Sequence, residues 1–202
     1  MKTILLTGFE PFGGEAVNPA LEAVRRIPDE IGGVRIVKLP VPVVYAQAAD
    51  CVIDAIRRYQ PFAVLSVGQA AGRSAVSLER VAINMDDAAA PDNAGDIRTD
   101  LPIAPDGPAA YFATLPNRQL IAAVQAAGID CRLSNSAGTY VCNHLLYSVL
   151  HHAALHQPDM TAGFMHVPLI PEQAEGKPNM PSVPLETIVS AIEACLRSLS
   201  AG

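Results

Sequence analysis

Residues 130–146 read Asp130-Cys-Arg-Leu-Ser-Asn-Ser-Ala-Gly-Thr-Tyr-Val-Cys142-Asn-His-Leu-Leu146. The run at 130–134 is predicted to form a strand, and apolar residues recur at helical spacing after position 140. The segment between them is small, polar and contains a glycine, so a helix is expected to begin near residues 139–140 and to continue to residue 156. A strand that leads through a short loop into a helix is the building unit of an α/β fold.

The same alternation of short apolar runs and longer helical patterns continues along the chain. Strands are expected at residues 3–7, 35–39, 63–67, 130–134 and 163–167, and helices at 19–26, 45–59, 111–127, 140–156 and 185–199. Asn18 is expected to cap the first helix, with Pro19 at its first position. The pattern predicts a single-domain α/β/α sandwich over residues 1–202, with a mostly parallel twisted sheet and helices on both faces. Residues 76–84 alternate in polarity and predict a further strand or hairpin.

Two stretches lack apolar periodicity and are expected to be long loops. Residues 86–108 are rich in Asp, Pro, Ala and Gly, and residues 168–184 carry Pro, Gly and Lys. One interpretation is that both loops are simply solvated surface. Alternatively, the second loop, which begins beside His166, borders a functional site and becomes ordered with substrate or a neighbouring subunit.

Composition limits the classes to which the protein can belong. The chain has 202 residues, of which 50% are hydrophobic and 17% charged, and a net charge of −6. These values argue against a general binder of nucleic acid or anionic membranes and favour a small-molecule or peptide substrate. The apolar run at the N-terminus is too short for a signal peptide and no segment is long enough to span a membrane, so a cytoplasmic location is expected. The widely spaced cysteines predict free thiols in a reducing compartment.

Cys142 lies in the first turn of the helix expected at 140–156. Unpaired backbone N–H groups and the positive end of the helix dipole favour a thiolate there, so the pKa of Cys142 is expected to fall from about 8.5 towards or below neutrality beside a cationic histidine. The same N–H groups can receive a developing oxyanion. The alternative is that Cys142 is a small buried hydrophobic residue.

A nucleophilic cysteine needs a base, and reactive groups in open α/β sheets gather outside the carboxyl ends of the strands. His166 is the one histidine on a predicted strand and is therefore the best-placed base. Glu79 lies in an otherwise apolar run, where a charge is costly unless it is paired. This carboxylate is a candidate to orient the imidazole of His166, as the acid does in a serine-protease triad. An exposed strand acid, or a partner of Arg80, remains the alternative for Glu79.

The other histidines are expected to have no catalytic part. His144 is two positions from Cys142 and therefore lies on another side of the helix, where it is expected to be packed or solvated. His152 and His156 have the spacing of a metal pair, but residue 153 is alanine where a zincin carries glutamate. No metal site is expected from them.

Four motifs span nearly the whole chain in a fixed order. They are Gly8-Phe-Glu-Pro-Phe-Gly-Gly14 with Asn18-Pro19, Gly68-Gln69 followed by Leu78-Glu-Arg-Val-Ala-Ile-Asn84, Ser134-Asn-Ser-Ala-Gly-Thr-Tyr-Val-Cys142-Asn-His144, and Met165-His-Val-Pro168. Together they resemble the pyrrolidone carboxyl peptidase family, also called pyroglutamyl peptidase I. The departures are slight: Ser136 and Tyr140 stand where Thr and Phe are frequent in that family.

The resemblance implies a cytosolic cysteine peptidase with an α/β/α sandwich fold that removes N-terminal pyroglutamyl residues from peptides. It implies no metal or cofactor, and commonly a homotetramer. By the same resemblance Cys142 is the nucleophile, His166 the base and Glu79 its orienting acid. The reaction expected is acyl transfer through a thioester, with His166 protonating the leaving amine.

A pyroglutamyl ring has apolar methylenes and a cis-amide edge, so its pocket should be apolar with a few directed hydrogen bonds. Phe9 and Phe12, in the glycine-flanked loop after the first strand, could sandwich the ring, and the resemblance favours Phe12 most strongly. Gln69 could match the lactam C=O and N–H. The alternatives are that the phenylalanines only anchor the loop and that Gln69 only caps a turn.

Two other classes compete with the peptidase. One is a different cysteine or acyl-transfer hydrolase on the same scaffold, and the other is a binding or assembly protein without activity. Intact Glu79, Cys142 and His166 favour an enzyme over the binding protein.

Overall fold

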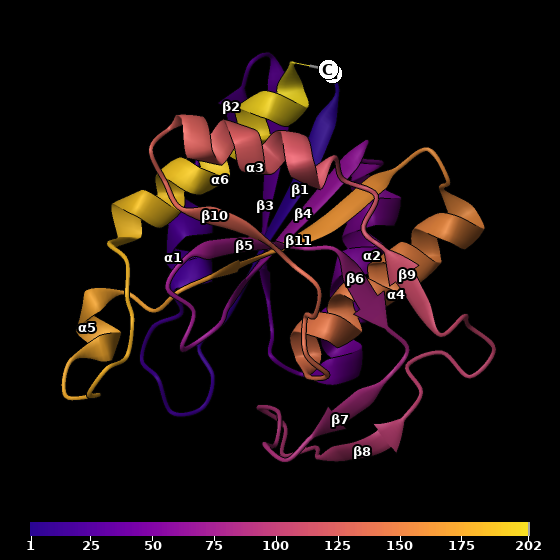
Figure 1. Ribbon diagram of the computed structural model, residues 1–202. Helices are drawn as coiled ribbons and strands as arrows, with labels where there is room; N and C mark the ends of the chain where they lie inside the picture. Colours follow the sequence, from indigo (N-terminus) through magenta and orange to yellow (C-terminus); the bar gives the residue numbers. More distant parts are fainter. Residues whose placement is uncertain (202) are drawn as a thin grey trace.

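The computed structural model describes residues 1–201 and has helices on both sides of a central sheet (Figure 1). The strands are β1 (Thr3–Phe9), β2 (Glu30–Ile31), β3 (Val34–Val41), β4 (Ala63–Gln69), β5 (Val76–Glu79), β6 (Val81–Ile83), β7 (Asp86–Ala88), β8 (Arg98–Leu101), β9 (Ala110–Phe112), β10 (Cys131–Ser134) and β11 (Thr161–Val167). The helices are α1 (Pro19–Arg26), α2 (Tyr45–Tyr59), α3 (Asn117–Ala126), α4 (Val141–His156), α5 (Pro171–Ala174) and α6 (Leu185–Ser200).

The main sheet has seven strands in the order β10-β5-β11-β4-β1-β3-β2. Strands β3, β1, β4 and β11 run parallel, and β5 and β10 are parallel to each other. The short contact between β11 and β5 is antiparallel, as is the β2 edge. The prediction of a mostly parallel sheet between two helical layers is therefore confirmed.

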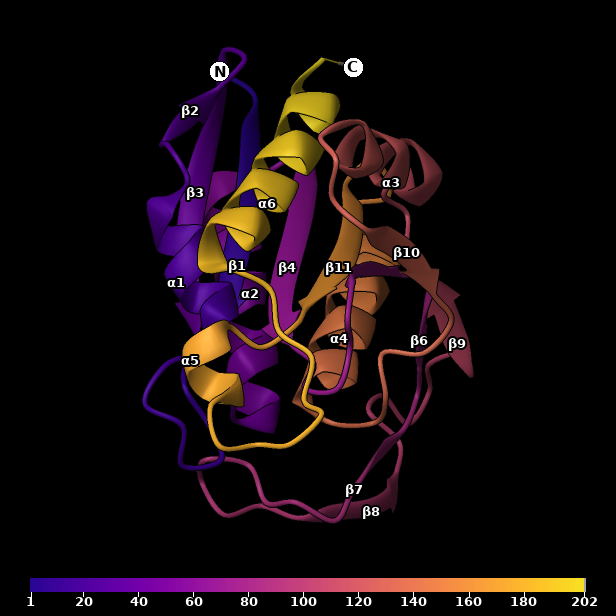
Figure 2. The same cartoon turned by 60° about the vertical axis from the view of Figure 1, so that its left-hand side comes forward.

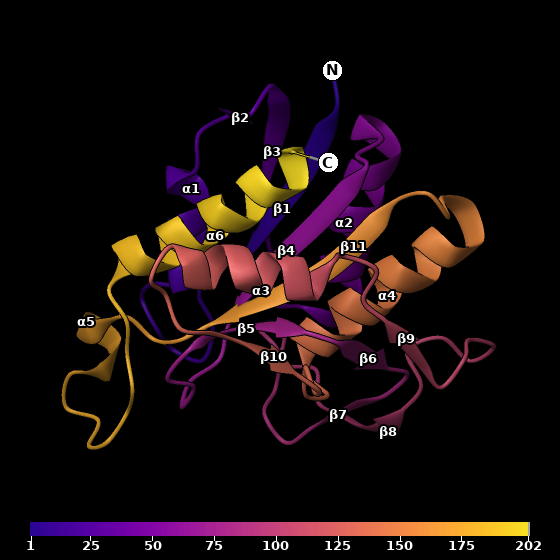
Figure 3. The same cartoon turned by 45° about the horizontal axis from the view of Figure 1, so that its top comes forward.

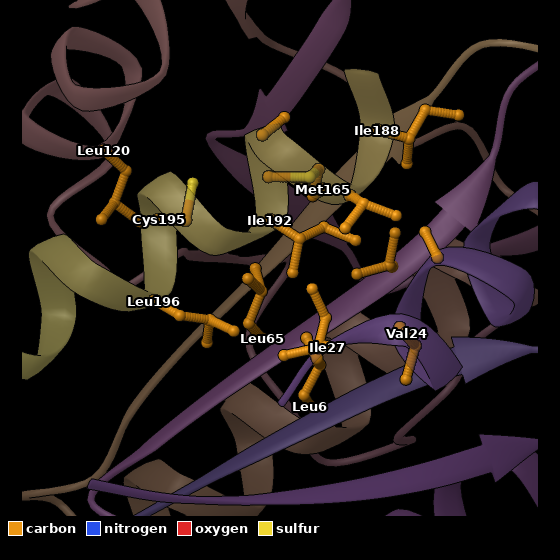
Figure 4. Packing of buried hydrophobic residues seen from close by; sticks show 14 of the residues in the cluster. Leu6, Val24, Ile27, Leu65, Leu120, Met165, Ile188, Ile192, Cys195 and Leu196 are labelled. Carbon is orange, nitrogen blue, oxygen red and sulfur yellow. The ribbon is translucent and has the colours of Figure 1, made fainter. Parts of the chain in front are cut away.

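Alternation of side chains along the strands divides the core into two halves. Helices α1, α3 and α6 cover one face, where Leu6, Leu65 and Met165 of the strands pack against Ile192 and Leu196 of α6 (Figure 4). Helices α2 and α4 cover the other face, and the aromatic residues of the core are concentrated there. Figure 3 shows α3 and α6 in front of the sheet with α2 and α4 behind it.

The helix expected at residues 111–127 is wrong over its first part. Residues Ala110–Phe112 form β9, which pairs antiparallel with β6, and α3 begins only at Asn117. Pro116 accounts for the difference, because proline has no amide hydrogen and disfavours helical conformation in the residue before it.

The two predicted loops contain regular structure that the prediction missed. Strands β7 and β8 pair antiparallel within residues 86–108, and α5 lies within residues 168–184. The expected run at 76–84 divides into β5 of the main sheet and β6 of a separate two-stranded sheet. In Figure 2 the β7–β8 ribbon forms the lower edge of the molecule, and α5 lies above it on the left. Among residues 1–201, no helix combines the length and the apolar character that crossing a membrane requires.

Candidate active site

His166 and Glu79 form a buried pair on the α4 side of the sheet. The Nδ1 atom of His166 lies 2.7 Å from Oε1 of Glu79, and the two residues are 4% and 0% exposed. Glu79 is thus neither an exposed strand acid nor a partner of Arg80. Because Nδ1 is engaged with the carboxylate, Nε2 is the ring nitrogen left for a reacting group.

Glu79 reaches His166 from a strand that runs the other way. Strand β5 is antiparallel to β11, with His166 opposite Ser77, so the end of β5 points away from the carboxyl ends of the parallel strands. The rule that reactive groups collect at those ends holds for His166 and Gln69 but does not describe Glu79.

Arg73 is the second partner of Glu79, and the sequence analysis did not identify it. Its Nη1 lies 2.7 Å from Oε1 of Glu79 and also donates to Oγ of Ser77, while Nη2 donates to the carbonyl of Ser136 at 3.2 Å. The guanidinium therefore joins the orienting acid to the loop that leads to Cys142. The signal in the sequence was a cation in the loop 70–75, six positions before Glu79.

Cys142 is the second residue of α4, and its sulfur lies against the strand next to His166. The first helical hydrogen bond runs from the His144 N–H to the Tyr140 carbonyl at 3.1 Å, so the amides of the helix start, including that of Cys142, precede it. Gly68 of β4 is the register partner of His166, and a Cβ atom at Gly68 would lie 3.1 Å from the Cys142 sulfur. Only glycine leaves this room for the thiol.

The side chain of Asn143 holds the start of α4 against the backbone at Ile83 and Met85. Its side chain accepts from the Ile83 N–H at 3.0 Å and donates to the carbonyls of Ile83 and Met85 at 2.9 and 3.0 Å. It is 1% exposed, so these bonds satisfy a buried amide. The residue after the candidate nucleophile thus ties α4 to β6, a role that the sequence motif did not reveal.

The electrostatics of the site contradict one prediction. Burial, reinforced by the charge of Glu79, raises the pKa of the Cys142 thiol to about 12, although Arg73 opposes the shift. Burial also lowers the pKa of His166, although the hydrogen bond that its ring donates to Glu79 and the charge of Glu79 oppose the shift. The expectation that the pKa of Cys142 falls is therefore wrong, because burial and the charge of Glu79 outweigh the charge of Arg73. The pair rests as a thiol beside a neutral imidazole.

Glu79 stays ionised in this setting. Burial alone would raise the pKa of Glu79, but the hydrogen bonds from His166 and Ser134, together with the charge of Arg73, hold it below its usual value. A fixed negative charge next to His166 favours the imidazolium that forms when the ring accepts a proton.

A small apolar cavity opens directly beside Cys142. Its walls are Phe9, Phe12, Val43, Gln69, Tyr140, Val141 and Cys142, and its volume is about 40 Å³. The three residues predicted for substrate binding are thus brought to the same cavity as the candidate nucleophile. Phe9 is buried against the ring of Phe164, whereas Phe12 is partly exposed and contacts Tyr140 at a centroid distance of 6.3 Å.

The β7–β8 ribbon and the loop between its strands contact both the start of α4 and one wall of this cavity. Asp86 is buried between Arg98 and His144, with its Oδ2 2.7 Å from Nη1 of Arg98 and 2.8 Å from Nδ1 of His144. His144 is therefore packed, as predicted. The Tyr140 hydroxyl donates to the Pro91 carbonyl at 2.9 Å, so the ribbon also holds one wall of the cavity.

A larger cavity, with a volume of about 530 Å³, lies elsewhere between α3 and β10. Arg80, Asn117 and Leu133 are among its walls, and the residues that line it within positions 1–201 include neither a cysteine nor a histidine. Chemistry rather than size therefore identifies the cavity at Cys142 as the candidate site.

Comparison with known proteins agrees with this geometry. The sequence model of the family described as pyroglutamyl peptidase matches residues 2–201. The chain belongs to this family. It is 47% identical over 194 residues to pyrrolidone-carboxylate peptidase 1 of Caldanaerobacter subterraneus subsp. tengcongensis, with 96% of each chain covered. It is 49% identical over 193 residues to pyrrolidone-carboxylate peptidase of Streptococcus pyogenes, covering 96% of this chain and 90% of that one.

Solved structures of the family share the fold. The crystal structure of pyroglutamyl peptidase I from Bacillus amyloliquefaciens superposes with a TM-score of 0.96 at 40% identity, covering 100% of this chain and 96% of that one. A mutant pyrrolidone carboxyl peptidase from Pyrococcus furiosus gives 0.93 at 38% identity, with 97% of each chain covered. The family resemblance read from the four motifs is therefore confirmed, while the roles of Glu79, Cys142 and His166 stay predictions.

Proposed function

We propose that this chain is a cysteine peptidase that hydrolyses the amide bond after an N-terminal pyroglutamyl residue. Cys142 is its nucleophile, His166 its general base and Glu79 the acid that orients His166. One observation carries the assignment: Glu79 binds Nδ1 of His166 at 2.7 Å, while the register partner of His166, Gly68, lies against the Cys142 sulfur.

The first half of the reaction follows from the resting protonation states. As the Cys142 sulfur bonds to the pyroglutamyl carbonyl carbon, the thiol proton moves to Nε2 of His166, which gives an imidazolium beside the Glu79 carboxylate. Collapse of the tetrahedral intermediate breaks the C–N bond, and the imidazolium returns the proton to the leaving amine. The product of this half is a thioester on Cys142.

The second half regenerates the thiol. Water gives a proton to His166 as its oxygen attacks the thioester carbon, and pyroglutamate leaves as the sulfur regains a proton from the imidazolium. In both halves the backbone N–H groups at the start of α4 stabilise the oxyanion, since they precede the first helical hydrogen bond at His144.

The cavity beside Cys142 supports a small, mostly apolar ring as the substrate group. Its volume of about 40 Å³ is below the about 150 Å³ of a cavity that takes benzene, so the walls have to move apart for a lactam. Phe12 precedes Gly13 and Gly14, which are exposed and have φ angles of 62° and 80°, and it is itself only half-buried. We assign Phe12 to the wall that moves to admit the lactam ring, and Phe9 to the wall that stays fixed against its other face.

The test is hydrolysis of a pyroglutamyl aminocoumarin amide by the wild type and Cys142→Ser under reducing conditions. Activity in the wild type with near-background signal in Cys142→Ser supports reaction, substrate class and nucleophile together. Cys51→Ser is the matched control, since Cys51 lies on α2, and it should keep wild-type activity. An inactive wild type would refute the peptidase, and an active Cys142→Ser would refute the nucleophile.

We also propose that the protein is a cytoplasmic homo-oligomer built from a single peptidase domain over residues 1–202. The four cysteines are all free, which fits a reducing compartment. Large apolar side chains at Phe112 and Leu155 are 72% and 61% exposed, which fits association of subunits. The tetramer commonly found in the family is the state expected, and light scattering that gives a monomer would refute association.

A further inference from the structure

Four of the five histidines of the chain line one cavity, which lies apart from the candidate active site. The cavity has a volume of about 460 Å³, residues of α2 and α4 form most of its walls, and the histidines are His144, His151, His152 and His156 of α4. Two of the rings are engaged through Nδ1, that of His144 with a carboxylate at 2.8 Å and that of His151 with the Tyr111 hydroxyl at 2.9 Å. The other two, His152 and His156, lie beside each other across one turn of the helix.

His152 carries an unsatisfied nitrogen inside the protein. The residue is 7% exposed, and its buried Nε2 atom has no hydrogen-bond partner among residues 1–201. Such a group reduces stability and calls for an explanation. Burial lowers the pKa of His152, as do the charges of His156, Arg57 and His151, so the ring is neutral at pH 7. In one of its two tautomers a neutral imidazole presents a lone pair at Nε2, which can bind a metal ion.

The rings of His152 and His156 have the spacing of two imidazoles on one metal ion. Their centroids are 4.8 Å apart, and the ring planes are inclined at 49°. Two imidazoles that bind an ion at about 2.1 Å through ring nitrogens, about 90–109° from each other, have centroids about 4.6–5.3 Å apart. His156 is exposed, so its ring is free to turn its nitrogen towards the same ion. The pair is therefore close to a chelating arrangement.

The charges around this pair are compatible with a bound cation. His156 is the last residue of α4, so the pair lies at the negative end of the helix dipole, where the final carbonyls have no helical partner. Asp50 of α2 is a wall of the same cavity and adds a negative charge. Arg57, the neighbouring cation on α2, is already paired with Asp54 at 3.3 Å.

We propose that His152 and His156 bind one divalent transition-metal ion of the Zn²⁺, Ni²⁺ and Cu²⁺ class. Imidazole suits these ions, whereas Mg²⁺ and Ca²⁺ prefer oxygen ligands. Among residues 1–201 no group of three or more His, Cys, Asp or Glu is arranged to hold a metal, so the pair supplies two ligands and water in the cavity the others. The sequence analysis expected no site because residue 153 is not glutamate, but that glutamate is the general base of a zincin and not a ligand. The site has no part in the proposed reaction, since Cys142 lies at the other end of α4.

The test is a calorimetric titration of Cys142→Ser with NiCl₂. This background removes the thiol of the candidate active site, which could bind the metal itself. The expected result is one Ni²⁺ per chain, and at a free Ni²⁺ concentration 100-fold above the measured Kd the Tm should rise by about 5–11 °C. His156→Ala in the same background should weaken binding by about 100-fold, because one imidazole then binds without the second. No binding to Cys142→Ser, or equal binding after His156→Ala, would overturn the proposal.

His151→Gln in the same background is the matched control. His151 lies on the same helix and lines the same cavity, but its Nδ1 is engaged with Tyr111. Its affinity for Ni²⁺ should stay within twofold of that of Cys142→Ser, and an equal loss in His151→Gln and His156→Ala would overturn the assignment to His152 and His156. Because His156 is exposed, His156→Ala should keep the metal-free Tm within about 2 °C, which separates a lost ligand from a lost fold.

Discussion

Gly68→Ala should disable the site by crowding it. A Cβ atom at this position would lie 2.8 Å from Cζ of Phe164 and 3.1 Å from the sulfur of Cys142. Since carbon atoms pack at about 3.5 Å or more, the Phe164 ring has to retreat by about 0.7 Å. That ring is fully buried and lies 4.7 Å from the His166 ring between centroids, so the base and the nucleophile are displaced together.

The expected cost has two parts. Overpacking of a core costs about 1–3 kcal/mol, which for a chain of this size lowers Tm by about 2–12 °C. A misplacement of about 1 Å between reacting groups costs about 100-fold in rate, so kcat should fall by about 10- to 100-fold. Thermal unfolding followed by circular dichroism and hydrolysis of the pyroglutamyl aminocoumarin amide measure the two parts.

Gly163→Ala supplies the matched control. A Cβ atom at Gly163 of β11 would lie 2.8 Å from Cδ1 of Leu115, an overlap of the same size in the same sheet but on the opposite face. It should lower Tm to a similar extent and leave kcat within about twofold. The reasoning is refuted if both variants lose stability equally and Gly68→Ala keeps wild-type kcat.

Further outcomes follow from the other contacts of the site. Glu79→Gln should lower kcat by about 10⁴-fold, as the comparable change does in a serine-protease triad, and full kcat would contradict an orienting acid. The profile of kcat/KM against pH should rise as His166 loses its proton below about pH 6.5 and stay level through pH 9, because the Cys142 thiol has a pKa of about 12; a fall between pH 7 and 9 would contradict this assignment. Arg73→Met removes a charge that lowers the pKa of His166, so the acid limb of the kcat/KM profile should move to higher pH. An unmoved limb would show that Arg73 has only a structural role. Asn143→Ala deletes three buried hydrogen bonds and, at about 1 kcal/mol each, should lower Tm by about 6–12 °C; an unchanged Tm in a thermal melt would contradict this.

Local pattern was enough for most of the fold. Periodicity located the parallel strands and the long helices, and the Asn18 cap is present, with its side chain accepting from the Ala20 N–H at 3.0 Å. The sequence pattern gave a wrong prediction at residues 110–116. Helical spacing of apolar residues suggested a helix there, but Pro116 prevents a helix from running through this position, and α3 begins only after it. It also failed for β7 and β8, because their pairing depends on the buried contact of Asp86 with Arg98, which joins distant residues of ordinary loop composition.

The site shows the same division between local and distant information. Cys142 and His166 were recognisable because each stands at the end of a regular element, and Glu79 because it breaks an apolar run. Arg73 carries no such mark, since its importance comes from contacts that only the folded chain creates. The pKa of Cys142 was mispredicted for a related reason: the helix start is visible in the sequence, but the depth of burial is not.

The position of β11 has a consequence for how the molecule is made. It lies between β4 and β5 in the sheet, yet it follows both of them in the sequence and is the last strand among residues 1–201. Until residue 167 has been synthesised, β4 and β5 have no partner between them, and both present open edges that invite pairing with other chains. At about 5–20 residues per second, the ribosome exposes this gap for several seconds after β5 has emerged. Closing of the sheet and arrival of His166 on the strand next to Gly68 are then one event, so a nascent chain completes its sheet and its candidate catalytic site together.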